Sequence, residues 1–192
     1  MIPDFNHSGV LPPFLPGQNP TSNHAVAPYR VSLIDFVEKF CTSPTRLKIL
    51  QGFIEYRISL KQIGIDNGFQ WIDGSFVEDV ENTKGRDPSD LDLITFAHRP
   101  HQYLNNPDWG NFINANLGLF SPTAVKSSFH CDAYYIDLNL PSVTIVNRTS
   151  YWFGLFSHQR DTFLWKGMLE INMQEQEQVA QQFLASGGNY AP

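Results

Sequence analysis

The amino-acid sequence predicts a mixed α/β domain, with a mixed sheet flanked by helices. Short apolar segments typical of strands alternate with longer segments whose apolar residues recur at helical spacing. The chain has 192 residues, 42% of them hydrophobic and 14% aromatic, which suffices for one full core and argues against a second. We place the domain at residues 31–186, between an amino-terminal arm and a flexible tail over residues 187–192.

The arm, over residues 1–30, is expected to be extended and rich in proline. Six of the thirteen prolines fall within the first 28 residues, a density that excludes a helix and disfavours the interior of a sheet. We expect Phe5, Leu11 and Phe14 to dock the arm against the domain.

Helices are expected where apolar residues recur behind a capping residue. Ser32 is a suitable amino-terminal cap for a first helix, which Pro44 is expected to stop. A longer amphipathic helix follows over residues 47–63, where Gly64 can close it. Later helices are predicted at residues 103–119 and in the Gln/Glu-rich segment that ends at Ala185. Strands are predicted at residues 69–72, 91–96, 129–138 and 165–173.

Charge and cysteine content restrict the class of protein. The formal net charge of −6 argues against a general nucleic-acid binder, because phosphate contacts need clustered Lys and Arg. Cys41 and Cys131 are too few for a disulfide framework, which favours a reducing compartment. The sequence begins without the pattern of a secretory signal, and no apolar run approaches the roughly twenty residues of a membrane helix. We therefore expect a cytoplasmic protein without a membrane segment.

Two carboxylates, Asp90 and Asp92, stand two residues apart at the start of a predicted strand. Because side chains alternate along a strand, both acids project to one side while Leu91 enters the core. Two like charges side by side repel each other unless a cation neutralises them, which favours a divalent metal site. The alternative is that both acids merely solvate the edge of the strand.

A third acid is needed to complete such a site, and Asp132 lies in the predicted neighbouring strand. Asp137 is the competitor, but an offset of five places the two acids on opposite faces of that strand. We choose Asp132, because Asp137 lies near the strand end, where acids ordinarily face solvent.

A turn at Gly74 and Ser75 follows the predicted strand at residues 69–72. Gly74 lets the backbone approach a ligand without a Cβ clash, while the following amides and the Ser75 hydroxyl can hold phosphate oxygens. In the loop that follows, two basic residues can bind phosphates. The Lys84 ammonium group would act as a point charge, and the planar Arg86 guanidinium group would donate two parallel hydrogen bonds. The alternative for these two residues is a solvated, charged loop.

Together, the Gly74-Ser75 turn, the Asp90-x-Asp92 pair and Asp132 resemble the signature of the DNA polymerase β-like nucleotidyltransferase superfamily. The resemblance implies the nucleotidyltransferase fold, with Gly74 and Ser75 as nucleotide-binding residues. It also implies Asp90, Asp92 and Asp132 as catalytic residues and as ligands of Mg²⁺ or Mn²⁺.

Longer stretches resemble a little-characterised bacterial family of standalone nucleotidyltransferase-like proteins; these are residues 70–78, 88–92 and 151–167. The sequence departs from polymerase-like members after the Gly-Ser turn. Those members often carry Gly and Arg there, whereas this loop contains Glu78, Asp79 and Glu81, which would repel a triphosphate.

The late segment is rich in basic and aromatic residues, including Trp152, His158 and Lys166, and these could line an acceptor pocket. The alternative is structural use, with Trp152 and the apolar residues Phe153, Leu155 and Phe156 in the core.

The function implied by the resemblance is Mg²⁺-dependent transfer of a nucleoside monophosphate from an NTP to a hydroxyl acceptor. The acceptor stays open between RNA, a protein and a small molecule, and Asp132 is the candidate acceptor of the nucleophile's proton. The alternative is a nucleotidyltransferase-like binding module that serves as an antitoxin with a toxin partner or as a phage-defence component.

Overall fold

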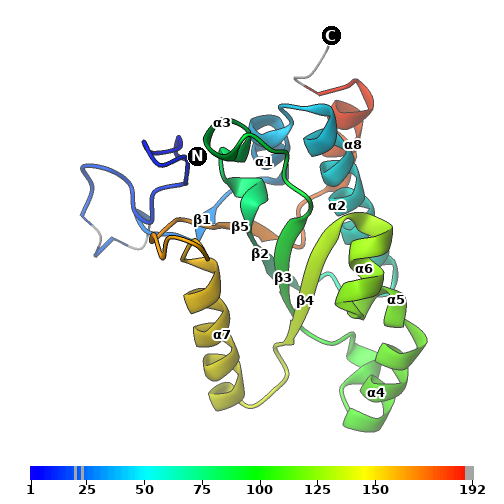
Figure 1. Ribbon diagram of the computed structural model, residues 1–192. Helices are drawn as coiled ribbons and strands as arrows, with labels where there is room; N and C mark the ends of the chain where they lie inside the picture. The colour runs from blue at the N-terminus through cyan, green and yellow to red at the C-terminus, as the bar shows by residue number, and fades with distance from the viewer. Residues whose placement is uncertain (20, 23, 189–192) are drawn as a thin grey trace.

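The computed structural model describes residues 1–19, 21–22 and 24–188. Its centre is a five-stranded sheet with the strand order β1-β5-β2-β3-β4 (Figure 1). The strands are β1 (Tyr29–Arg30), β2 (Gly68–Asp73), β3 (Leu91–Ala97), β4 (Cys131–Asp137) and β5 (Leu169–Asn172). β3 pairs with β4 in parallel and β1 with β5 in parallel, while β2 is antiparallel to both its neighbours. The predicted mixed sheet is therefore confirmed, with β2, β3 and β4 as neighbours.

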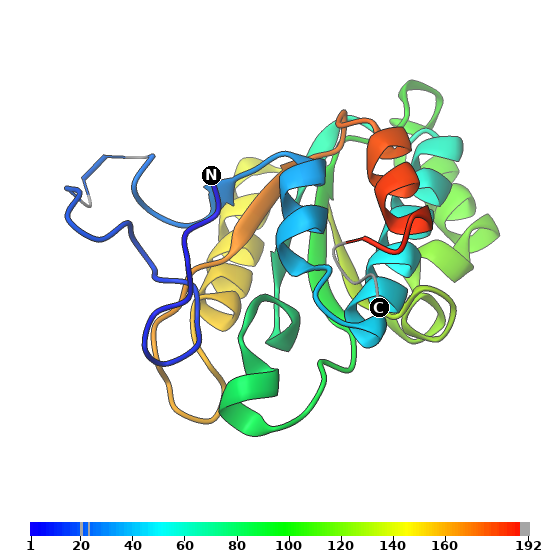
Figure 2. The same cartoon turned by 90° about the horizontal axis from the view of Figure 1, so that it is seen from above.

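Helices cover the two faces of the sheet unequally (Figures 1 and 2). One face is covered by α1 (Leu33–Phe40), α2 (Pro44–Gln62), α6 (Pro122–Phe129) and α8 (Glu177–Ala185). The other face carries α7 (Ser142–Phe156). Short elements fill the connections: η1 (Ser75–Val77) and α3 (Val80–Lys84) after β2, then η2 (His101–Tyr103), α4 (Asn106–Ala115) and α5 (Leu117–Phe120) after β3.

Alternation along the strands separates two apolar clusters. The larger cluster lies between the sheet and α1, α2 and α8, and Leu91 and Leu93 belong to it as predicted. The smaller cluster lies toward α7, where Trp71, Ile94 and Phe156 are buried together. In the described part of the chain, no helix is both long and apolar enough to cross a membrane.

Capping residues explain where the first two helices begin. The Ser32 side chain accepts a hydrogen bond from the Asp35 amide, so the predicted cap of α1 is confirmed. Pro44 does not stop α1, which already ends at Phe40; it is the first residue of α2 behind the cap Ser43. The reason is that proline lacks an N–H that the first helical turn would leave unpaired in any case.

Several predicted elements differ from the structure. The helix expected at residues 103–119 is divided into η2, α4 and α5, and the strand expected at residues 165–173 is confined to β5. The strand expected from residue 129 begins at Cys131, because α6 occupies the residues before it. α7 was not predicted, since it is rich in β-branched and aromatic residues, which favour strands, and exposes Val143 and Val146.

The amino-terminal arm lies against the domain through the three expected side chains. Leu11 is fully buried, Phe5 packs 6.2 Å from Phe40, and Phe14 lies 5.8 Å from Trp165, measured between ring centroids. The last two residues of the predicted arm form β1, so the arm enters the sheet itself. Residues 189–192 of the predicted tail lie outside the described residues.

Candidate functional site

Three aspartates form a row across β2, β3 and β4, at the end of the sheet where β3 begins. Asp73 of β2 is in register with Asp92 of β3, and Asp92 is in register with Asp132 of β4. Residues paired in register project to the same face of a sheet, here the face toward α7. We call Asp73, Asp92 and Asp132 the acidic row. Asp90 stands just before β3, so the structure brings the three predicted acids to one end of neighbouring strands.

Gly74 touches this row directly. Its φ of 80° lies in the left-handed region, and a Cβ at this position would stand 1.7 Å from Asp92 Oδ2. Any side chain at position 74 would therefore collide with the Asp92 carboxylate as well as strain the backbone. The predicted Gly74-Ser75 turn and the predicted Asp92 are thus parts of one site.

The carboxylates of the site crowd one another. Burial, followed by the charges of Asp90 and Asp132, raises the pKa of Asp92 from 3.8 to about 6. Burial raises the pKa of Asp73 from 3.8 to about 7, against the opposing charge of Lys166. Burial is the largest cause of both shifts, and at Asp92 the neighbouring carboxylates add to it, so the charged forms of both acids are disfavoured here.

Lys126, on α6, supplies part of that charge. Its ammonium group forms an ion pair with Asp90 Oδ2, and its side chain is 52% exposed. The hydrogen bond to Asp90 raises the pKa of Lys126, and the charges of Asp132 and Asp92 act in the same direction. The lysine therefore faces all three predicted acids, although it pairs with one.

In the conformation described for residues 1–19, 21–22 and 24–188, no group of three or more His, Cys, Asp or Glu side chains is arranged to hold a metal ion. The predicted trio is thus gathered at one place without forming a ready-made coordination sphere. Asp90 is instead held by two partners of the chain, since Ser89 Oγ donates to Oδ1 at 2.8 Å and Lys126 pairs with Oδ2.

A second lysine, Lys166, is buried beneath the Gly74 turn. Its Nζ lies 3.0 Å from Asp73 Oδ1 and 2.8 Å from Glu78 Oε1. Gln159 completes the arrangement by donating to Glu78 Oε2 at 2.7 Å. The contact with Asp73 is electrostatic, because Asp73 Oδ1 has no hydrogen-bond partner of good geometry among the described residues.

Sequence reasoning missed the roles of Asp73, Lys126 and Lys166. A signal existed for Asp73, which directly precedes the Gly74 turn at the end of a predicted strand. Lys166 lies in the segment considered for an acceptor pocket, but the structure buries it against Asp73 and Glu78. Of the residues expected in the core there, Phe156 is buried, whereas Phe153 and Leu155 are 36% and 43% exposed.

Two acids of the loop after Ser75, Glu78 and Glu81, have counter-ions of their own, whereas Asp79 accepts a hydrogen bond from the neutral Asn82 side chain. Glu78 is paired with Lys166, and Glu81 accepts a hydrogen bond from Arg46 Nη2 at 2.9 Å. Arg46 also donates to the carbonyl oxygens of Phe76 and Glu78, which ties the loop to α2. The repulsion that this loop was expected to exert on a triphosphate is reduced accordingly.

Lys84 and Arg86 lie in that loop and form no ion pair with Asp90, Asp92 or Asp132. Lys84 Nζ stands 3.8 Å from Glu78 Oε2 and 4.0 Å from Asp161 Oδ2. Arg86 is exposed and donates to the carbonyl oxygen of its neighbour Asp87 at 3.1 Å. In this conformation both residues fit the solvated, charged loop.

Asp137 has a structural role at the far end of β4. It is buried and paired with Arg99, whose Nε lies 2.7 Å from Asp137 Oδ2. The expectation that Asp137 faces solvent is therefore wrong, because Arg99 gives this acid a partner inside the fold. The choice of Asp132 as the acid near Asp92 agrees with the register of β3 and β4.

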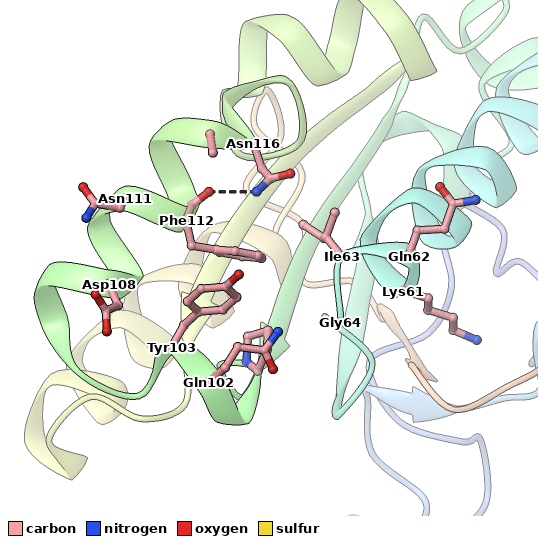
Figure 3. Close-up of a pocket in the computed structure, with 12 residues that line it drawn as sticks. Lys61, Gln62, Ile63, Gly64, Gln102, Tyr103, Asp108, Asn111, Phe112 and Asn116 are labelled. Carbon is pink, nitrogen blue, oxygen red and sulfur yellow. Dashed lines mark hydrogen bonds between the residues drawn. The ribbon is translucent and has the colours of Figure 1, made fainter.

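A pocket of about 730 Å³ lies between the end of α2 and the η2–α4 segment (Figure 3). The rings of Tyr103 and Phe112, 4.5 Å apart, form its apolar wall, and amide side chains such as Gln102 and Asn111 surround them. The pocket is reached where β3 ends, whereas the acidic row lies where β3 begins. Its lining does not include Asp90 or any acid of the acidic row.

The chain belongs to a family of unknown function, DUF6932, whose model matches residues 3–172. The match runs from the arm to the end of β5, and it includes the Gly74 turn, Lys126, Lys166, Asp90 and the acidic row. No curated protein and no solved structure matches the chain.

Proposed function

We propose that this member of DUF6932 has the nucleotidyltransferase fold and transfers a nucleoside monophosphate from an NTP to a hydroxyl acceptor, with release of pyrophosphate. The observation that supports the proposal most is the contact between the Gly74-Ser75 turn and Asp92, in register with Asp132 of the neighbouring strand. This arrangement brings a candidate phosphate-binding turn to a set of crowded carboxylates. The signature noted in the sequence therefore corresponds to one spatial site.

Asp90, Asp92 and Asp132 would hold the divalent cation, Mg²⁺ or Mn²⁺. Carboxylate oxygens are the donors that these ions prefer. Burial and then the charges of Asp90 and Asp132 raise the pKa of Asp92, and a bound cation would oppose both effects. When bound, such a cation would neutralise phosphate charge and polarise the reacting phosphoryl group. The donor chemistry of the site fits the ion, and Asp90 becomes available to it once Lys126 is displaced.

The remaining roles belong to the chain itself. The Ser75 hydroxyl and the amides after Gly74 would hold phosphate oxygens, since glycine leaves the backbone open to close approach. Asp132, which is partly exposed, would accept the proton of the attacking hydroxyl group. Lys166 pairs with Asp73 and Glu78, which lie before and after the turn in the chain, and so holds the two sides of the turn together.

The test is a labelling experiment with α-³²P-labelled NTPs, Mn²⁺ or Mg²⁺, and separate RNA, protein and small-molecule fractions of a cell extract. We expect label to enter one fraction in a metal-dependent manner. Asp132→Asn should abolish transfer, while Asp66→Asn, which removes an exposed acid before β2, should not. Undiminished transfer by the Asp132→Asn variant would contradict the assignment of the proton acceptor.

A second candidate function has its own supporting observation. The ion pair between Lys126 and Asp90 would also suit a nucleotidyltransferase-like binding module, in which a lysine replaces the cation permanently. Such a module would act as an antitoxin or a phage-defence component. A stable complex with the product of a neighbouring toxin gene, together with the absence of Mn²⁺ binding, would favour this candidate over the enzyme.

A further inference from the structure

We infer that Lys126 is a tethered counter-ion of the site, which yields Asp90 to a divalent cation and then contacts the phosphates of the nucleotide. The inference rests on the proposed function and names a nucleotide-binding residue for it. Lys126 of α6 pairs with Asp90, whereas Lys84 and Arg86, the basic residues expected from the sequence to bind phosphate, have other partners.

The backbone that carries Lys126 is firmly anchored. Val125, its neighbour on α6, is fully buried. A Cβ at Gly52 of α2 would stand 2.1 Å from the Phe129 carbonyl oxygen, so α2 and α6 approach each other too closely for a side chain between them. His130 then turns the chain in a left-handed conformation, with a φ of 56°, directly into β4. The base of Lys126 is thereby held a few residues before Asp132.

The side chain of Lys126, in contrast, reaches toward solvent. It is 52% exposed, whereas Lys166 in the same site is 3% exposed and enclosed between two carboxylates. Lys126 regains water when it leaves the ion pair, because its side chain lies half in solvent, whereas the nearly buried Asp90 needs another cation in its place. A ligand that binds Asp90 more strongly can therefore replace Lys126 without disturbing the fold.

Asp90 is nearly buried, and its two oxygens have different partners. Its side chain is 9% exposed, and Ser89 satisfies one oxygen with a neutral hydroxyl group. The second oxygen is the one that Lys126 occupies. Because a divalent cation shared by Asp90, Asp92 and Asp132 would need an oxygen of Asp90, the metal and the ammonium group compete for the same carboxylate.

Displacement leaves the ammonium group at the edge of the site, next to Asp92 and Asp132. An NTP brought in with the metal carries more negative charge than the metal neutralises, and its phosphate oxygens are the acceptors that a mobile lysine can reach. Lys126 thus serves the apo protein as a counter-ion and the loaded protein as a phosphate contact. This exchange keeps a positive charge next to the Asp90 carboxylate in both states.

The experiment measures Mn²⁺ binding by electron paramagnetic resonance of the free ion, in the full-length protein and in Lys126→Met and Lys126→Arg variants. Lys48→Met is the control, because Lys48 is an exposed lysine of α2 that pairs with no described residue. We expect Lys126→Met to bind Mn²⁺ about tenfold more tightly than wild type, which corresponds to about 1.4 kcal/mol. Lys126→Arg and Lys48→Met should remain within about twofold of wild type.

The second measurement is binding of a non-hydrolysable NTP analogue at saturating Mn²⁺, where Lys126→Met should bind several-fold more weakly than wild type. Circular dichroism and melting curves verify that each variant is folded. Equal Mn²⁺ affinities of wild type and Lys126→Met, with both proteins binding, would overturn the inference and leave the proposed function intact. An unchanged affinity for the analogue would overturn the phosphate contact.

Two other outcomes separate the inference from the proposed function. If Lys126→Met binds Mn²⁺ and wild type does not, the competition is supported, and the binding module replaces the enzyme as the function. If neither protein binds Mn²⁺ up to millimolar concentrations, both the proposed metal site and the exchange at Asp90 are refuted.

Discussion

The two faces of the sheet carry charged groups whose balance differs. On the face toward α2, the guanidinium group of Arg57 is fully buried and donates to Glu177 Oε1 at 3.0 Å. It also donates to Gln70 Oε1 at 2.7 Å and to the Asn172 carbonyl oxygen at 3.0 Å. Burial lowers the pKa of Arg57, but the charge of Glu177 opposes this effect. The Arg57 cation is thus paired with one carboxylate and two neutral oxygens.

On the face toward α7, the acidic row gathers charges of the same sign. The pKa of Asp92 is raised to about 6, although the charges of two nearby lysines oppose the shift. The buried charge toward α2 has the partners that a stable fold needs, whereas the neighbouring carboxylates toward α7 oppose one another. The face that carries the candidate site thus differs from the other face in holding like charges that the fold leaves only partly compensated.

Removal of the balanced cation should have the largest effect on stability. Arg57→Met leaves Glu177 and Gln70 buried with fewer partners, and we expect a loss of about 3–5 kcal/mol in the free energy of unfolding. Urea denaturation measures this loss. The control is Arg30→Met, which breaks the exposed pair with Glu170 and should change stability by less than about 1 kcal/mol. A similarly small change in Arg57→Met would contradict the contrast between the faces.

Addition of a divalent cation should stabilise the unbalanced face. A cation that binds only the folded protein adds about 2.7 kcal/mol at a concentration one hundred times its dissociation constant. Mg²⁺ or Mn²⁺ should therefore raise the melting temperature in differential scanning fluorimetry. The Asp90→Asn/Asp92→Asn double variant should fold and lose this response, and a response that persists in it would exclude these acids as the metal ligands.

Removal of one crowded carboxylate should stabilise the metal-free protein at high pH. The folded pKa of Asp92, about 6, lies above its ordinary value of 3.8, so its contribution to stability is present below pH 3.8 and is lost as the pH rises through 6. Asp92→Asn does not titrate and should gain on the order of 2 kcal/mol over wild type at pH 8. Unfolding measured from pH 4 to pH 8 without metal should show this gain appear with rising pH.

The gain in stability of Asp92→Asn over wild type should increase with pH. A gain that is constant from pH 4 to pH 8 would show that Asp92 is not crowded in the folded protein. Transfer activity provides an independent readout, because the same substitution should abolish it while the stability rises.

The smallest effect is expected for the loop after the Gly74 turn. Lys84 is drawn toward Glu78 and Asp161, and Arg86 is exposed, so both can reach a phosphate only after the loop moves. The Lys84→Ala/Arg86→Ala double variant should raise the dissociation constant of NTP by about threefold, or about 0.7 kcal/mol. Isothermal titration with an NTP analogue measures this change, and unchanged affinity would assign both residues to a solvated loop.

Local rules in the sequence predicted much of the fold. Ser32 begins a helix because its hydroxyl oxygen accepts from a helical amide, and Gly64, with a φ of 85°, follows the end of α2. The strand that contains Leu91 and Leu93 was predicted from alternation, and the same alternation placed Asp90 and Asp92 away from the core. The helical state of α7 could not be predicted, because its residues favour strands and its outer face is apolar.

The candidate site was predicted only in part, for a physical reason. That Asp90 and Asp92 project together and follow a glycine turn was predictable, since both features depend on neighbours in the chain. The place of Asp73 in the row, the ion pair of Lys126 with Asp90 and the position of Lys166 next to Gly74 came from the fold. These contacts join segments far apart in the chain, and they depend on strand register and helix packing, which no local periodicity encodes.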